Sequence, residues 1–457
     1  MTASPQQLLE LERRCMWYPF TQMQTYAAEE PLVIAGGEGP YLIDAAGRRY
    51  LDGVASLWTN VHGHRVPAID AAIRAQLERI AHSTLLGLTH PPAIELAGRL
   101  IALAPPGLTR VFYSDNGSTA VEVALKMALQ FWRQTTPPQP RKQRFVSFRE
   151  GYHGDTLGAV SVGGIDLFHA RYGPLLFPTL KVHGAFCYRC HLQESFPACR
   201  LRCVDELEAV LARQAEEIAA VVIEPLVQGA GGMIVAPPGH LARVRDLCRR
   251  YDVLLIADEV AVGCGRTGTF FACEQEGVAP DLLAMGKGVA AGYLPLAATL
   301  TTERIYEAFL GAPAEQKTFF HGHTFTGNPL ACAAALASLD LFEKTNLVQA
   351  VREKSALLAA WLQPLRRRRS VGDIRQRGLL AGIELVRQRD SRAPFPPELT
   401  IGHRVTLAAR RRGAIVRPLG HVVVLMPPLA IEPDLLRELV DIVDQAIAEA
   451  ADPLAKE

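Results

Sequence analysis

Short β-rich runs alternate with helical patterns through the middle of the chain. The runs predicted as strands are TRVFYSD, QRFVSFRE, AAVVIEPLV, DVLLIADEV and PLAATLTT. Amphipathic stretches such as STAVEVALKMALQFW and PPGHLARVRDLCRRY lie between them. This alternation predicts an α/β fold with a mostly parallel central sheet, in which ligands bind beyond the carboxyl ends of the strands.

The last part of the chain has a different pattern. Long helical stretches begin near NPLACAAALASLDLFEK, and the short apolar runs LLAGIELV, GAIVRPL and HVVVLMPP follow. This α+β pattern predicts a second, smaller domain after the large one.

The charge balance excludes several classes of partner. Lys and Arg number 48 and Asp and Glu 47, so the net charge is +1 and no long-range field favours nucleic acid or an anionic membrane. No apolar run approaches membrane-spanning length, and the first residues lack the apolar region of a secretion signal. The nine cysteines are scattered, which favours reduced thiols. We therefore expect a soluble, cytoplasmic protein that binds neither nucleic acid nor a membrane.

A single lysine, Lys287, lies between two glycines in the apolar stretch LLAMGKGVAAGYLPLAA. A lysine in such a setting either lies on a surface loop or is paired, neutralised or used covalently. Upstream, Asp258 follows the apolar run VLLIA, where an ordinary surface acid is the simplest interpretation. Together, however, these are the two groups that pyridoxal phosphate chemistry requires. The lysine bonds to the cofactor and later carries a proton, and the acid keeps the pyridine nitrogen protonated.

Two further stretches suit the same cofactor. Gly117 and Ser118 follow a predicted strand and begin an amphipathic helix, where free amide groups and the helix dipole favour a phosphate. A plain helix cap explains the same serine equally well. Tyr152 and His153 lie in a glycine-bounded loop after the next predicted strand, which suits stacking on a cofactor ring, although single aromatic residues usually belong to the core.

A dinucleotide site is an alternative. The sequence GCGRTG over 263–268 fits the G-x-G-x-x-G pattern letter for letter. In that motif the glycines begin a long helix, whereas here Gly277 and Pro280 interrupt the sequence that follows. The pattern therefore favours a nicotinamide cofactor only weakly.

A zinc site is a second alternative. The stretch FCYRCHLQESFPACRLRC brings His191 together with four cysteines, Cys187, Cys190, Cys199 and Cys203, at spacings near those of a small zinc site. Because three residues separate the second cysteine pair and the intervening loop is short, we expect no metal here. The favoured interpretation is a loop with reduced thiols near the mouth of the active site.

Seven stretches, taken together and in order, resemble one enzyme family, the class III pyridoxal-phosphate aminotransferases of fold type I. They are GVASLWTNVHGH, SDNGSTAVEVALKMA, GYHGDT, IEPLVQGAGGM, IADEVAVGCGRTG, MGKG and HGHTFTGNPLACAAA. The resemblance covers nearly the whole chain and implies a large domain joined to a smaller α+β domain built from both chain ends. We expect an N-terminal segment over 1–65 that contributes to the small domain and the active site, a large cofactor-binding domain over 66–330 and a C-terminal small domain over 331–457.

The resemblance also implies roles for single residues. Lys287, Asp258 and Tyr152 would be catalytic, with Lys287 bonded to pyridoxal 5'-phosphate and Asp258 paired with its pyridine nitrogen. Gly117 and Ser118 would bind the phosphate, and Tyr152 and His153 would lie near the ring.

Other roles depend on a homodimer with active sites at its interface. His323 and Thr324 of HGHTFTGN would reach the phosphate from the other subunit, with Gly322 close to the substrate. Arg417 in IVRPLG would bind the carboxylate of a keto acid, a task that suits a planar guanidinium.

Two stretches of the chain resemble one subgroup of this family. WYPFTQM near the start and RPLGHVVVLMPP near the end resemble the aminotransferases of biotin synthesis, which convert 8-amino-7-oxononanoate into 7,8-diaminononanoate with a small-molecule amino donor. Members that use S-adenosylmethionine typically have tyrosine where this chain has Phe20, and two tryptophans where it has Leu57 and Trp58. Because a sulfonium and an adenine gain from aromatic faces and a hydroxyl, the departure slightly favours lysine as donor. Another class III ω-aminotransferase, acting on diamines or ω-amino acids, is the alternative.

Overall fold

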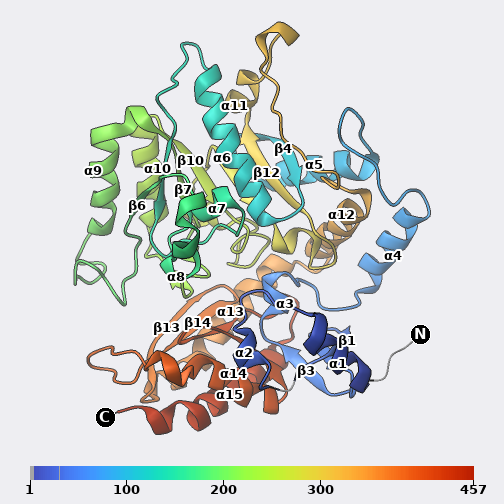
Figure 1. The fold of residues 1–457 in the computed structure, drawn as a ribbon, viewed down its shortest axis with the longest axis vertical. Coiled ribbons are helices and arrows are strands. Elements are labelled where there is room, and N and C mark those ends of the chain that lie inside the picture. The colour runs from blue at the N-terminus through green and yellow to red at the C-terminus, as the bar shows by residue number, and fades with distance from the viewer. Residues whose placement is uncertain (1–4, 30, 457) are drawn as a thin grey trace.

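A seven-stranded sheet forms the centre of the chain, which the computed structural model describes over residues 5–29 and 31–456 (Figure 1). In spatial order its strands are β4 (Leu108–Ser114), β12 (Ala297–Thr302), β11 (Leu282–Met285), β10 (Leu254–Asp258), β7 (Ile218–Ile223), β5 (Arg144–Phe148) and β6 (Leu180–Val182). Strand β12 runs antiparallel to both of its neighbours, and the remaining pairs are parallel. The predicted α/β fold with a mostly parallel sheet is confirmed.

The central strands are apolar throughout because helices cover both faces of the sheet. Every residue of β7, β10 and β11 is buried. In β10, Leu254 and Ile256 pack into the core that includes helix α6 (Gly117–Gln134), and Leu255 packs into the core that includes α10 (His240–Arg250). Side chains thus alternate between two cores, and the polar residues are left to the strand ends.

The remaining elements either pack around this sheet or belong to the smaller domain. The longer helices are α1 (Pro5–Cys15), α4 (Pro67–Leu77), α5 (Pro91–Leu103), α9 (Asp205–Gln214), α12 (Pro329–Lys344), α13 (Leu347–Leu362), α14 (Ile401–Arg411) and α15 (Pro433–Ala450). Short helices are α2 (Met23–Tyr26), α3 (Ala55–Trp58), α7 (Leu157–Val162), α8 (Asp166–His169) and α11 (Glu303–Ala308). A small hairpin pairs β8 (Val227–Gln228) with β9 (Ile234–Val235).

The two ends of the chain meet in the smaller domain. One sheet joins β1 (Ile34–Glu38), β2 (Tyr41–Asp44) and β3 (Arg49–Asp52) to β15 (Ala414–Ile415), and another orders β13 (Val371–Arg377), β14 (Leu380–Leu385), β17 (Val422–Leu425) and β16 (Arg417–Leu419). Figure 1 shows the blue N-terminal elements beside the orange and red C-terminal ones. The smaller domain therefore draws on both ends, while the exact boundaries at 65 and 330 stay a prediction. Within the described residues, we find no helix with the length and apolar character needed to cross a membrane.

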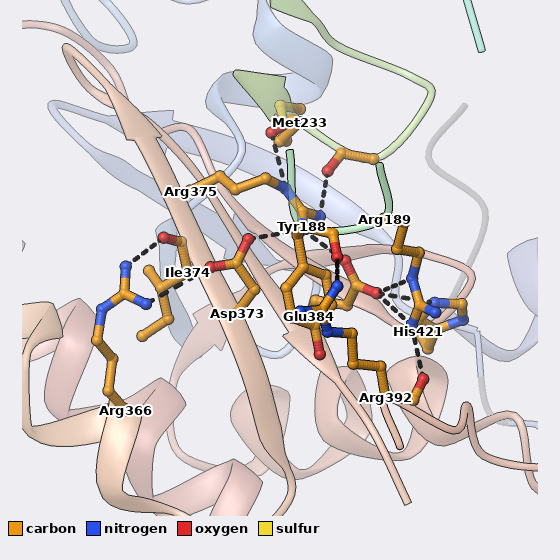
Figure 2. Close-up of polar contacts among 11 residues, drawn as sticks. Tyr188, Arg189, Met233, Arg366, Asp373, Ile374, Arg375, Glu384, Arg392 and His421 are labelled. Atoms are coloured by element: carbon orange, nitrogen blue, oxygen red, sulfur yellow. Dashed lines mark hydrogen bonds and ion pairs between the residues drawn. The ribbon is translucent and has the colours of Figure 1, made fainter. Parts of the chain in front are cut away.

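A cluster of charged residues joins loops of the large domain to β13 and β14 (Figure 2). The buried carboxylate of Glu384 accepts hydrogen bonds from Arg189 Nε at 2.7 Å and from Arg375 Nη1 at 2.5 Å. Arg375 also donates to the carbonyl oxygens of Gly232 and Met233, and Arg392 donates to that of Tyr188. Each cation thus has an anionic or carbonyl partner, so the cluster fixes one domain against the other.

The ionisation of Glu384 makes this junction pH-dependent. Burial alone would raise the pKa of Glu384, but hydrogen bonds from His421 and Arg375 and the charges of Arg375 and Arg189 lower it to about 2. Because this pKa lies below that of the unfolded chain, the stabilisation is present above the unfolded value and is lost as the pH falls toward 2.

We therefore expect Glu384→Gln to lower the free energy of unfolding by about 3 kcal/mol at pH 7, since the pKa lies roughly 2.5 units below its ordinary value. In urea titrations the difference from the native protein should shrink by about 1 kcal/mol between pH 7 and pH 4. The matched control is Glu449→Gln, which removes an exposed partner of Arg411 and should leave the free energy of unfolding nearly unchanged at both pH values. A difference independent of pH would contradict the assignment.

Candidate active site

Five strands of the central sheet end at one cavity of about 750 Å³. Each contributes polar residues at or just beyond its carboxyl end: β4 leads to Asp115, β5 to Tyr152 and His153, β7 to Glu224, β10 to Asp258 and β11 to Lys287. Because parallel strands run in the same direction, their carboxyl ends lie at one edge of the sheet and bring these polar groups together.

Lys287 faces the acids of this cavity. Its Nζ lies 5.3 Å from the centre of the Trp58 ring. Burial lowers the pKa of Lys287, while the charges of Asp258, Glu224 and Asp155 oppose that shift. The amine therefore reaches its neutral, nucleophilic form more readily than an exposed lysine does.

Asp258 is held in a fixed orientation. One of its oxygens lies 2.7 Å from His153 Nδ1, and the other accepts the Val260 backbone N–H at 3.0 Å. Both Asp258 and His153 are 4% exposed. A carboxylate aligned in this way can hold a protonated ring nitrogen in the cavity, with His153 supporting it from behind.

The N-terminus of α6 forms another wall. Asn116 caps the helix by accepting the Thr119 N–H, which leaves Gly117 and Ser118 at the first turn beside the cavity. Ser118 Oγ accepts the Thr156 N–H at 3.0 Å. A Cβ at Gly117 would lie 2.4 Å from Val260, so only glycine allows this close approach. This geometry suits the anion site that the sequence predicted, and the role of Gly117 and Ser118 in it stays a prediction.

Residues of the short element α3 also line the cavity, and their backbone forms a left-handed turn. Ala55, Ser56, Leu57 and Trp58 all have φ between +47° and +71°, a conformation that costs roughly 1–2 kcal/mol for each residue with a side chain. Asp52 stabilises the turn by accepting the Ser56 N–H at 2.9 Å and its hydroxyl at 2.7 Å. The turn directs Leu57 and Trp58 to the cavity, and strain of this kind is typical of functional sites.

Glu224 lines the same cavity but was not singled out from the sequence. Its two oxygens accept the backbone N–H groups of Tyr152 at 3.0 Å and Gly229 at 2.9 Å. Burial raises the pKa of Glu224 to about 7, and the charge of Asp258 adds to that effect, while the charge of His153 lowers it. The signal that identified Asp258, an acid directly after an apolar strand, also applies to Glu224.

Of the predicted substrate residues, Leu57 and Trp58 line the cavity, whereas Phe20, Gly322 and Arg417 are not among its lining residues. Arg417, on β16, has no hydrogen bond or ion pair to any residue that the structure describes. Burial lowers its pKa, and the charge of the nearby Tyr152 raises it. Phe20 is 56% exposed and packs edge-on against Phe168, which in turn contacts Tyr152.

The segment around His323 lies outside the residues that line the cavity. His323 Nδ1 is 2.6 Å from Asp115 of its own chain, and Asp115 does line the cavity. Gly322 and Thr324 are exposed. Their roles across a dimer interface stay predictions.

The two alternative motifs lie elsewhere. Residues 263–268 form buried turns instead of beginning a helix, and Arg266 donates to the carbonyl oxygens of Leu379 and Pro427. A dinucleotide pyrophosphate therefore lacks the helix N-terminus that it needs there. The cysteine-rich loop lines a small cavity of its own and is absent from the residues around the large one.

The cavity fits pyridoxal phosphate. The close approach of the backbone at Gly117 leaves the first amide groups of α6 free for a phosphate. Val260 and Ala261 line the cavity beside Asp258, where a planar ring can pack. The buried atoms Trp58 Nε1 and Asp115 Oδ1 have no partner among the described residues, so polar groups of a ligand can satisfy them.

Comparisons with known proteins agree with this geometry. A family model described as aminotransferase class III matches residues 24–447. The adenosylmethionine-8-amino-7-oxononanoate aminotransferase of Geobacter sulfurreducens is 57% identical over 443 residues, which cover 97% of each chain. The crystal structure of the enzyme of that name from Methanocaldococcus jannaschii has a TM-score of 0.92 at 42% identity and covers 97% of this chain and 99% of that one. An amine transaminase from an uncultivated Pseudomonas species, solved in its PLP-bound form, has a TM-score of 0.91 at 40% identity, with 96% and 99% covered.

We expect Lys287→Ala to reduce amino-group transfer by at least about 10³-fold, because the variant lacks the one amine placed to bond the cofactor and to move the proton. Initial rates and circular dichroism spectra measure the effect on activity and fold. Lys181→Ala is the matched control, since that half-buried lysine donates to the Ser147 hydroxyl and the Ser161 carbonyl and does not line the cavity. Retained transfer in a folded Lys287→Ala variant would refute the role.

Proposed function

Because the chain belongs to the class III aminotransferases, we propose that it converts 8-amino-7-oxononanoate into 7,8-diaminononanoate, a step of biotin synthesis, with pyridoxal 5'-phosphate as cofactor. The observation that carries the reaction type is the placement of Lys287 and Asp258 at the ends of neighbouring strands, facing one cavity. The names of relatives that match along nearly their whole length support the substrate.

In this mechanism the chain holds, orients and moves protons. When bound, pyridoxal phosphate supplies the carbonyl that takes up the amino group and the electron-withdrawing ring that acidifies the neighbouring carbon. Lys287 Nζ would take the proton from the amine-bearing carbon of the donor and pass it to the C4′ carbon of the cofactor; in the second half of the exchange it would carry a proton from C4′ to the carbonyl carbon of the acceptor. Asp258, oriented by His153, keeps the ring nitrogen protonated, and Gly117 and Ser118 hold the phosphate.

Arg417 gives the cavity its preference for a keto acid. It lies beside Tyr152, is partly buried and has no anionic partner among the described residues, which leaves its guanidinium free for a carboxylate. Because donor and acceptor enter the same cavity in turn, Arg417 can serve both if each carries a carboxylate.

For the donor we propose lysine over S-adenosylmethionine. Leu57 lines the cavity with an aliphatic side chain, and Phe20 lacks a hydroxyl and packs on Phe168. Leu57 thus offers no aromatic face and Phe20 no hydroxyl, which are contacts that a sulfonium and an adenine prefer. The relatives' names include adenosylmethionine, so both donors enter the test.

The proposal includes a cytoplasmic homodimer. All nine cysteines are free thiols, as a reducing compartment favours. Large apolar side chains are exposed beside the predicted interface segment: Leu86 at 89%, Leu88 at 62%, Phe320 at 81% and Phe325 at 61%. His82 contacts Phe325, so these two segments form one apolar surface suited to a second copy.

We expect the purified holoenzyme to form 7,8-diaminononanoate from 8-amino-7-oxononanoate when lysine is supplied, and to form less with S-adenosylmethionine. Mass spectrometry of the product measures both rates, with Lys287→Ala as the blank. Turnover with adenosylmethionine alone would reverse the donor assignment. Activity restricted to diamines or ω-amino acids would replace the proposed substrate by that of an ω-aminotransferase.

We expect Arg417→Ala to lower kcat/KM for the keto acid by about 30- to 100-fold, because a charge-assisted pair worth roughly 2–3 kcal/mol is lost. The loss should appear mainly as a higher KM, and Arg417→Lys should recover only part of it. The exposed Arg404 on α14 provides the control Arg404→Ala. An unchanged KM in Arg417→Ala would place the carboxylate site elsewhere.

A further inference from the structure

The loop between β6 and α9 has little to hold it in one conformation. Residues 183–201 form neither helix nor strand, and Ala185 is the one fully buried residue among them. Structureless loops of this length are uncommon in compact domains unless something else orders them. The loop nevertheless carries Tyr188 and Arg189, which join the large domain to the smaller one (Figure 2).

Four thiols of this loop surround one small cavity. Cys187, Cys190, Cys199 and Cys203 line a space of about 10 Å³, enough for a single atom the size of a water oxygen. The charges of the other three thiols all act on Cys203, so the four sulfurs lie within electrostatic range of one another. None of the four forms a disulfide. The two Cys pairs, separated by two and by three residues, thus converge from both ends of the loop.

A second group of metal-binding residue types lies nearby. Among the described residues, only His183, His191 and Glu206 bring three ligand atoms within 4.8 Å of one another. One oxygen of Glu206 already accepts both the backbone N–H of His183, at 2.9 Å, and the hydrogen bond with its ring, at 2.8 Å. The rings of His183 and His191 stack at 4.1 Å. These contacts explain the group without an ion.

We propose that Cys187, Cys190, Cys199 and Cys203 bind one structural Zn²⁺ ion, which closes the loop between β6 and α9. Four thiolates are the ligand set that selects zinc over the harder cations. All four cysteines line the cavity, but no three of their sulfur atoms lie within 4.8 Å of one another. Binding of the ion would therefore draw the two cysteine pairs closer together. This proposal revises the expectation of no metal.

The ion would stabilise a loop that has almost no hydrophobic core. A loop with one buried residue gains little from apolar packing, whereas a tetrahedral thiolate site links its two ends directly. Tyr188 and Arg189 lie between the first two cysteines, so the ion would also fix the residues that contact Arg392 and Glu384. The site is structural and adds no group to the catalytic cavity.

The test is zinc analysis of the holoenzyme, purified in reductant from zinc-supplemented cells and passed through a chelating column. We expect one zinc per chain, released by a mercurial thiol reagent and measured with a metallochromic dye. We also expect cobalt(II) to restore the site with a thiolate-to-cobalt charge-transfer band. These readouts use the native chain, so they hold even if a cysteine variant fails to fold.

Substitution of single cysteines tests which residues bind the ion. Cys187→Ser and Cys203→Ser should each lose the zinc and lower the Tm, while Cys15→Ser, an exposed thiol elsewhere, should keep both. Glu206→Gln should keep the zinc. Absence of stoichiometric zinc, a disulfide within the loop under these conditions, or loss of zinc in Glu206→Gln instead of the cysteine variants would each overturn the proposal.

Discussion

The site depends on one constraint, the burial of a lysine beside carboxylates at the ends of adjacent parallel strands. Strands β7, β10 and β11 are buried on both faces, so polar side chains are tolerated only at their ends. Glu224, Asp258 and Lys287 all lie at these ends, and their charges act on one another. The fold therefore concentrates buried opposite charges in one cavity, where the acids raise the pKa of Lys287 against the effect of its burial.

Hydrogen bonds hold the walls of the cavity in place, and one wall, the turn at Ala55–Trp58, has a strained backbone. Asp52 holds the left-handed turn that presents Trp58, and Glu224 ties the Tyr152 loop to the loop that contains Gly229. Both carboxylates accept backbone N–H groups, so they fix the path of the chain around the cavity. Arg417 of the smaller domain lies near Tyr152, which lines this cavity, and Glu384 helps to hold the two domains together.

Local pattern was sufficient for much of this account. Alternating strands and helices predicted the α/β sheet, and an acid or lysine after an apolar run predicted Asp258 and Lys287. The antiparallel direction of β12 was not predictable, because a short β-rich run does not specify the direction in which it pairs. The turn at Ala55–Trp58 was not predictable either, since it contains no glycine and is stabilised by contacts with Asp52. Convergence of the four cysteines required the loop's path in three dimensions, which spacing does not supply.

The most direct test of the central claim is a half-reaction with a single substrate. Holoenzyme is mixed with 7,8-diaminononanoate in the absence of any keto acid, while the cofactor's visible absorption and the organic products are followed. The account predicts loss of the resting absorption band together with one equivalent of 8-amino-7-oxononanoate per chain, and neither change in Lys287→Ala. A holoenzyme that keeps its band and forms no ketone would contradict the claim that this cavity exchanges amino groups with that substrate.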